Sequence, residues 1–276
     1  MQNEIGIVEV IFENILPLLL VGSLTGLLAG FFGVGGGIIL GPFLLFFFQS
    51  HGMNVDIAVR VAFGTSLFCA VFNSIFSVYR HGRQGNVVWK VVPYIAGGSI
   101  FGAFAGSSLA AYLPGIVLKY ILAGVLLLLA FQVFAGVGGG SKSQSLKMSL
   151  KITLPIGFVS GFFAAMAGIG GGVFFVPVII LFLNVPVKKT AGTSSAIIIF
   201  TALAGVSGYI LHGLPAENLP HGSLGYVYVL AAIPILAGSL VFSQFGAYLN
   251  SILPLKYLRA FFSLFLLAIF IKLVLF

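Results

Sequence analysis

Two glycine-rich motifs interrupt an otherwise apolar chain, and they limit its possible folds more than any other feature. The first motif is Gly33-Val34-Gly35-Gly36-Gly37 and the second is Gly168-Ile169-Gly170-Gly171-Gly172. Each motif is followed by a proline, Pro42 in the first case and Pro177 in the second. Four glycines in five positions cannot continue a regular helix, because each glycine costs about 1 kcal/mol relative to alanine. Each motif therefore predicts a break in a helix.

The composition gives these breaks their meaning. Of the 276 residues, 60% are hydrophobic and only 7% are charged, and the mean hydropathy is +1.20. This composition excludes a soluble domain and predicts an all-α polytopic membrane protein. Inside a bilayer a broken helix must be buried in protein or line a wet cavity, because lipid satisfies no N–H or C=O group. A break that occurs in both halves is typical of the binding site of a transporter.

Hydropathy divides the chain into two sets of five apolar segments. They are residues 15–32, 38–48, 57–79, 87–112 and 117–135, and then 152–167, 173–183, 190–211, 224–249 and 257–276. The segments after the glycine motifs have about a dozen residues, fewer than the ~20 that a straight helix needs to cross the hydrocarbon core. We therefore expect half-helices or short tilted spans there. The predicted organisation is a first transmembrane repeat over 1–135, a linker over 136–151 and a second repeat over 152–276.

The two halves match beyond the glycine motifs. Gly64-Thr65-Ser66 corresponds to Gly192-Thr193-Ser194, and Gly98-Ser99 corresponds to Gly238-Ser239. These matches predict an internal duplication. An odd number of crossing units in each half would place the second repeat upside down relative to the first.

The basic residues test this orientation. If the first two segments of each half return to their starting side, ten Lys and Arg residues fall on one face and three on the other. The first face receives Arg80, Arg83, Lys90, Lys142, Lys147, Lys151, Lys188, Lys189, Lys256 and Arg259, and the second receives Arg60, Lys119, Lys272 and all five acidic residues. The positive-inside rule makes the first face and the linker cytoplasmic and places both termini outside. An arrangement of two inverted five-segment repeats follows. The expected location is a prokaryotic cytoplasmic membrane.

The motifs also predict an anion site. Helices that restart at Ile38 and Val173 would aim unpaired N–H groups and the positive end of the helix dipole into each break, where an anion binds favourably. Hydroxyl groups after the Gly64 and Gly192 positions can add neutral donors. The candidate substrate-binding residues are Gly33, Gly35, Gly36, Gly37, Ile38, Thr65, Ser66, Gly168, Gly170, Gly171, Gly172, Val173, Thr193, Ser194 and Ser195.

The alternative interpretation is purely structural. Glycines let helices approach closely, and buried hydroxyls bond to the carbonyl one turn earlier. We assign this packing role to the glycines spaced by four, which are Gly22, Gly26, Gly30, Gly98, Gly102, Gly106, Gly157 and Gly161. Alanine at Gly26 is therefore expected to be milder than leucine at Gly36 or Gly171. Asn73 and Ser74, two turns further along the same helix as Thr65 and Ser66, are candidates for additional donors at the site, but hydrogen bonds between helices are favoured for them.

Other functional groups are sparse. No Asp or Glu lies inside a predicted span, which disfavours a cation carrier, and no metal, cofactor or catalytic constellation is expected. The four histidines are predicted to be exposed near the ends of loops. His81 and His212 lie in the matching stretches 79–82 and 209–213 and are candidate gates. The +8 net charge does not indicate nucleic acid, because the basic residues occupy short loops between apolar runs.

The doubled pattern resembles a known family. GxGGG with a proline five residues on, followed by GTS, is similar to the TauE/SafE sulfite exporter family, also called the toluene sulfonate uptake permease family. The resemblance rests on residues 33–42 with 64–66 and on 168–177 with 192–195, and it covers nearly the whole chain. It implies a secondary transporter, linked to the proton gradient, of a sulfur-containing oxyanion such as sulfite, sulfoacetate or another organosulfonate. The family's members transport in either direction, and its name favours export. A passive anion channel built on the same break is the alternative.

Overall fold

The computed structural model describes residues 15–32, 35–134, 149–252 and 255–275. These residues form ten helices and one short β-hairpin. The helices are α2 (Ile15–Phe32), α3 (Gly37–Ser50), α4 (Val55–Arg83), α5 (Val92–Tyr112), α6 (Gly115–Phe134), α7 (Leu150–Met166), α8 (Gly172–Leu181), α9 (Val187–Gly213), α10 (Val229–Ile252) and α11 (Leu255–Leu275), and the strands are β1 (Ser223–Leu224) and β2 (Val227–Tyr228). The predicted all-α fold is confirmed. Five of these helices, α4, α5, α6, α9 and α10, contain stretches long and apolar enough to cross a membrane.

Each of the ten predicted apolar segments corresponds to one helix, and the two helices after the glycine motifs are short. Helix α3 has 14 residues and α8 has 10. At ~1.5 Å per residue they span about 21 Å and about 15 Å, less than the ~30 Å hydrocarbon core. Both helices are shorter than a straight membrane span, in agreement with the short elements that the sequence predicted.

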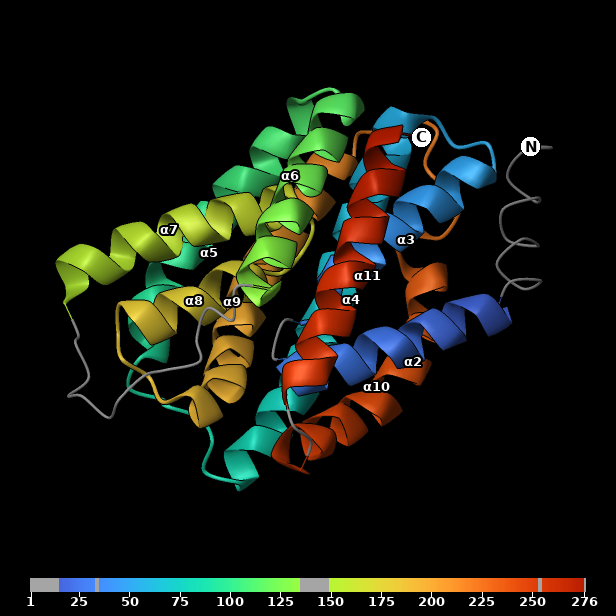
Figure 1. The fold of residues 1–276 in the computed structure, drawn as a ribbon. Helices are drawn as coiled ribbons and strands as arrows, with labels where there is room; N and C mark the ends of the chain where they lie inside the picture. The colour runs from blue at the N-terminus through green and yellow to red at the C-terminus, as the bar shows by residue number, and fades with distance from the viewer. Residues whose placement is uncertain (1–14, 33–34, 135–148, 253–254, 276) are drawn as a thin grey trace.

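Two parallel helix pairs flank the molecule, α2 with α10 and α5 with α7 (Figure 1). A Cβ atom at Gly98 would overlap the carbonyl oxygen of Leu154, and one at Gly102 would overlap that of Phe158. The backbones of α5 and α7 therefore touch along a stripe of small residues, as transmembrane helices commonly do. The predicted packing role is confirmed for Gly22, Gly26, Gly98, Gly102, Gly106, Gly157 and Gly161, each of which faces the backbone of a neighbouring helix.

Alanine at Gly26 is nevertheless expected to be costly for the fold. A Cβ atom there would overlap the backbone of Ser239, so α2 and α10 would have to separate. We expect Gly26→Ala to destabilise the protein by about 1–3 kcal/mol or more, as overpacking does. Gly124→Ala is the matched control, because nothing lies within 4 Å of that position. Thermal unfolding of the two purified variants tests this, and equal unfolding temperatures would contradict the observed packing.

Helices α4 and α9 run antiparallel through the interior. A Cβ atom at Gly64 would lie 3.3 Å from Tyr209, and one at Gly192 would lie 2.7 Å from His81. The start of each helix therefore lies beside the end of the other. Helices α6 and α11 lie side by side on the face shown in Figure 1.

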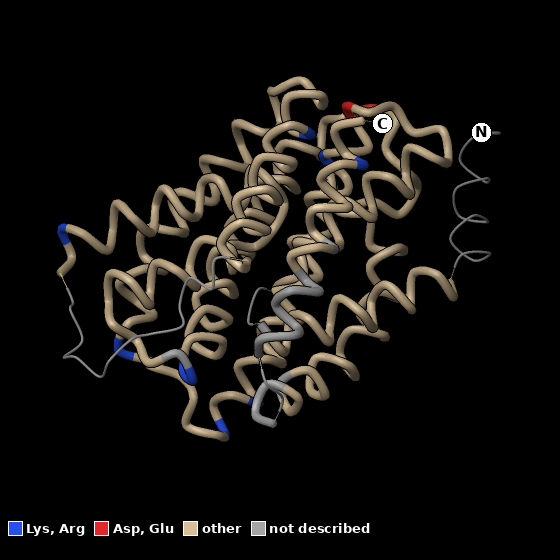
Figure 2. The backbone as a smooth tube through the Cα atoms, viewed as in Figure 1, with Lys and Arg blue, Asp and Glu red and all other residues tan. Residues whose placement is uncertain are grey.

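The charges separate between the two ends of the molecule. Arg80 and Arg83 at the end of α4 share one end with Lys188 and Lys189 at the start of α9, because the two helices are antiparallel. The described acidic residues gather at the opposite end (Figure 2). The described charges therefore follow the predicted split. Outside the described residues lie Lys142, Lys147, Glu4, Glu9 and Glu13, and the side chains of Lys256 and Arg259 are also not described. Which end faces the cytoplasm stays a prediction.

Two apolar segments begin before their helices do. The segments 87–112 and 224–249 become helical only at Val92 and Val229. Before α10 the chain forms the β1–β2 hairpin, in which Ser223 pairs with Tyr228. Hydropathy cannot separate a buried extended segment from a buried helix over so short a run. Both segments accept support from the opposite half of the chain, because Tyr228 and Val88 each donate a backbone hydrogen bond to a threonine there.

Candidate functional site

The glycine motifs turn the chain through a left-handed backbone conformation that favours glycine. Gly36 and Gly171 are the N-cap residues of α3 and α8, with φ of +78° and +104°, and Gly35 and Gly170 also have positive φ. Left-handed backbone is costly for residues that carry a Cβ atom. No side chain caps either helix, so the first N–H groups of α3 and α8 lack intrahelical partners. Gly33 lies outside the described residues.

The two breaks meet in the interior. The Cβ position of Gly37 lies 2.6 Å from the carbonyl oxygen of Ile169, which belongs to the second motif. The Ser66 hydroxyl on α4 lies 2.8 Å from the carbonyl oxygen of Gly168 and 3.2 Å from that of Gly37. The structure therefore brings together residues from both motifs and one of the predicted hydroxyls. The starts of α3 and α8, including Ile38 and Val173, are buried.

Thr65 and Thr193 have a structural role that the sequence did not reveal. The Thr65 hydroxyl accepts a 2.9 Å hydrogen bond from the N–H of Tyr228, just before α10. The Thr193 hydroxyl accepts a 3.0 Å bond from the N–H of Val88, before α5, and donates to the carbonyl of Lys189. Each threonine thus accepts a hydrogen bond from a backbone N–H in the segment before a helix of the opposite half.

These threonines can be tested by their effect on stability. Thr65→Val or Thr193→Val leaves a partly or fully buried N–H unpaired, which costs about 1–3 kcal/mol. The serine variants keep the hydroxyl and should lose much less. Thermal unfolding without any ligand measures this difference. Wild-type stability of both valine variants would show that the threonines do not hold the segments before α10 and α5.

The remaining predicted hydroxyls are buried and bonded. Ser194 donates to the carbonyl oxygen of Ala191, at 3.1 Å, which is the back-bonding alternative. The Ser195 hydroxyl lies 2.9 Å from that of Ser77 on α4. These contacts link α9 to itself and to α4, next to the point where the glycine motifs meet.

Asn73 and Ser74 on α4 were predicted to join helices, and only part of that prediction is confirmed. The Asn73 carbonyl oxygen accepts a 2.6 Å hydrogen bond from Ser239 on α10. The Asn73 amide nitrogen and the Ser74 hydroxyl are buried without a partner. Both face the first glycine motif, because the Cβ position of Gly36 lies 3.1 Å from the amide nitrogen and that of Gly35 lies 3.4 Å from the hydroxyl.

The two candidate gates differ from the prediction. His81 is 1% exposed rather than exposed, and its Nε2 lies 3.3 Å from the carbonyl oxygen of Gly30. Tyr209, not His212, occupies the corresponding place in the second half and donates to the carbonyl of Ala165. When the two halves are aligned so that Gly64 matches Gly192, His81 matches Tyr209. His212 is half-buried and lies against the ring of Tyr112.

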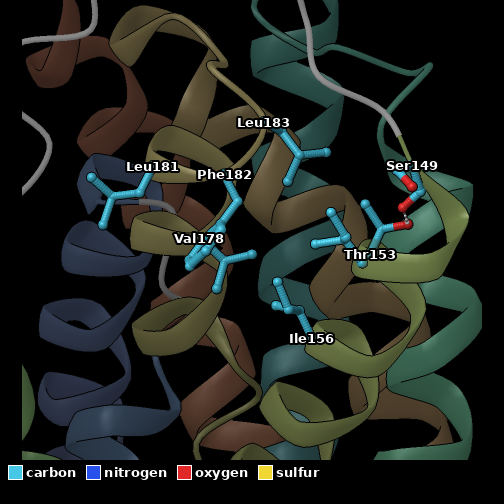
Figure 3. A pocket seen from close by; sticks show the side chains of 8 residues that line it. Ser149, Thr153, Ile156, Val178, Leu181, Phe182 and Leu183 are labelled. Carbon is cyan, nitrogen blue, oxygen red and sulfur yellow. Dashed lines mark hydrogen bonds between the residues drawn. The ribbon is translucent and has the colours of Figure 1, made fainter.

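A pocket of about 440 Å³ opens between α7 and α8 and lies apart from the glycine motifs (Figure 3). Its lining is apolar except for Ser149 and Thr153, and the Thr153 hydroxyl donates to the carbonyl of Ser149. No charged side chain lines this pocket. This pocket therefore presents fewer hydrogen-bond donors to an anion than the uncapped starts of α3 and α8 do.

The fold and site define a class of protein: a multi-pass integral membrane protein in which broken helices meet inside the bundle, the arrangement of membrane transporters. The chain belongs to the TauE/SafE sulfite exporter family, whose profile, described as "Sulfite exporter TauE/SafE", matches residues 18–273.

Similar proteins carry names of the same class. A probable membrane transporter protein of Haemophilus influenzae is 31% identical over 95% of this chain and 98% of its own length. A probable membrane transporter protein of Methanocaldococcus jannaschii is 30% identical over 90% of this chain and 91% of its own. The probable membrane transporter protein YdhB of Bacillus subtilis is 27% identical over 88% of this chain and 93% of its own. No solved structure matches the chain.

Proposed function

We propose that this protein is a secondary transporter that exports a small sulfur-containing oxyanion, such as sulfite, sulfoacetate or another organosulfonate. The observation that carries the proposal is the meeting of two uncapped helix starts inside the bundle, with Ser66 touching both glycine motifs. Unpaired N–H groups at helix starts favour a negatively charged ligand. The choice of a sulfur-containing oxyanion among anions rests on the name of the family, which describes sulfite exporters.

We further propose that the two halves, 1–135 and 152–276, are inverted repeats joined by a cytoplasmic linker, 136–151. The helix directions support this. Helix α10 starts beside Thr65 and runs parallel to α2, whereas α5 starts beside Thr193 and runs parallel to α7. The expected counterparts α2 and α7 thus begin at opposite ends.

Reciprocal hydrogen bonds support the same proposal. Thr65 bonds the segment before α10, and Thr193 bonds the segment before α5. Ser239 on α10 bonds Asn73, and Ser99 on α5 lies 2.7 Å from the Thr201 hydroxyl on α9. Pairs of this kind are expected where a two-fold axis in the membrane plane relates the halves, which also permits alternating access.

Cysteines introduced at Gly139 and Gly222 test the inversion directly. We expect them to react with a membrane-impermeant thiol reagent from opposite sides, Gly139 from the cytoplasm and Gly222 from outside, because the positive-inside rule places the linker inside. The buried Cys69 can be retained. Labelling of both cysteines from the same side would rule out the proposed topology.

Flux into proteoliposomes tests the transporter itself. A carrier that alternates between two states saturates with substrate and shows counterflow when one side is preloaded. A passive anion channel on the same scaffold, the second candidate, would carry electrical current without either property. Labelled sulfite and sulfoacetate are the first substrates to measure. Failure to saturate with either anion would favour the channel.

A further inference from the structure

We propose that the transported anion is held by one half of the site, through the Asn73 amide and the Ser74 hydroxyl beside the start of α3. This inference rests on the proposed function and adds which residues contact the anion. Both side chains are 0% exposed. Both lie on α4 and face the first glycine motif rather than the second.

A hydrogen bond from Ser239 fixes the orientation of the Asn73 side-chain amide. The Ser239 hydroxyl donates to the side-chain oxygen of Asn73, Oδ1, at 2.6 Å, which turns the amide nitrogen towards Gly36. That nitrogen has two N–H donors, and it has no partner. Buried polar groups are nearly always paired, so an unused donor of this kind indicates that a ligand completes it.

Ser74 offers the neighbouring donor. Its hydroxyl is also buried without a partner and lies 3.4 Å from the Cβ position of Gly35. The residue follows Asn73 on α4, and the two side chains lie against adjacent glycines, Gly36 for Asn73 and Gly35 for Ser74. With the N–H groups at the start of α3, they supply neutral donors beside the first glycine motif.

The chemistry of this cluster selects a ligand class. Neutral donors and a helix dipole stabilise a small oxyanion whose oxygens accept several hydrogen bonds. Sulfite and related sulfonates carry such oxygens.

The second half has no unpaired side-chain donors at the two positions equivalent to Asn73 and Ser74. The paired bonds of Ser239 with Asn73 and of Ser99 with Thr201 make Thr201 the counterpart of Asn73. The Thr201 hydroxyl already has two hydrogen-bond partners, the Ser99 hydroxyl and the carbonyl oxygen of Ile197, to which it donates. The next residue, Ala202, has no polar group. The two half-sites are therefore unequal, and the first half provides the side-chain donors.

The test gives the first half the residues of the second. In the double variant Asn73→Thr, Ser74→Ala, the amide and the free hydroxyl are lost while residue types found at the equivalent buried positions are introduced. We expect the KM for labelled sulfite in proteoliposomes to rise at least about tenfold, because each hydrogen bond to a charged group contributes about a factor of ten or more. The control Thr201→Val removes a buried hydroxyl from the other half and should leave KM within about twofold.

The outcomes separate the two proposals. If the wild-type protein shows no saturable flux of sulfite or sulfoacetate, the proposed function itself fails. If it transports but the double variant keeps the wild-type KM, or if Thr201→Val raises KM equally, the assignment of the anion to Asn73 and Ser74 is wrong. Should the double variant not fold, Ser74→Ala alone must still raise KM several-fold for the assignment to stand.

Discussion

Leucine in place of Gly36 or Gly171 is expected to abolish transport. Both residues have left-handed backbone, with φ of +78° and +104°, which costs a residue with a Cβ atom about 1–2 kcal/mol. The side chain at position 36 would enter the space beside the Asn73 amide, and that at position 171 would overlap the ring of Phe175. We expect flux in proteoliposomes to fall below about 1% of wild type, because a displaced helix start no longer aligns its N–H groups with the anion.

A matched glycine from the same helix controls for folding. Gly41 lies within α3, and its nearest neighbours beyond the helix are 3.9 Å from the Cβ position, which is ordinary contact. Gly41→Ala should therefore retain both expression and flux. If all three variants lost expression equally, the glycines would be shown to pack helices rather than to form a site. Normal flux in Gly36→Leu would be equally damaging to the proposal.

Sulfite flux is expected to follow the concentration of the protonated monoanion across about pH 5 to about pH 9. Above the pKa of that monoanion its concentration falls about tenfold per pH unit, so flux should fall in the same proportion. The described donors around the break, on Asn73 and Ser74, are neutral, and Asp56 lies in the first turn of α4 at the acidic end. We therefore expect the proton to travel on the substrate, and a fully ionised sulfonate to move few protons.

His81 is the residue that could overturn this mechanism, because it is buried at the basic end of α4 and histidine titrates near neutral pH. His81→Gln keeps a side chain that can donate to the carbonyl oxygen of Gly30 but does not titrate. We expect this variant to keep the wild-type pH profile. Stoichiometric proton movement with an organosulfonate in the wild type, lost in His81→Gln, would instead make His81 the proton carrier. A dye that reports internal pH measures it.

The sequence by itself determined the membrane class, the ten apolar helices and the two breaks. A helix is the element that satisfies its own backbone inside a bilayer, so each long apolar run had one outcome. Glycines at left-handed positions are similarly local, because the cost of a Cβ atom there does not depend on the rest of the fold. The doubled motif was also sufficient to indicate the family. The inverted arrangement of the repeats stays a prediction.

Tertiary structure alone decided where α5 and α10 begin and which polar groups are left over. The bonds from Tyr228 to Thr65 and from Val88 to Thr193 join residues 163 and 105 positions apart, so no local pattern contains them. The same holds for Asn73, whose carbonyl is occupied by Ser239 from the other half while its amide stays unpaired. A hydrogen bond between distant segments depends on packing that hydropathy does not encode, and the candidate site lies where such contacts meet.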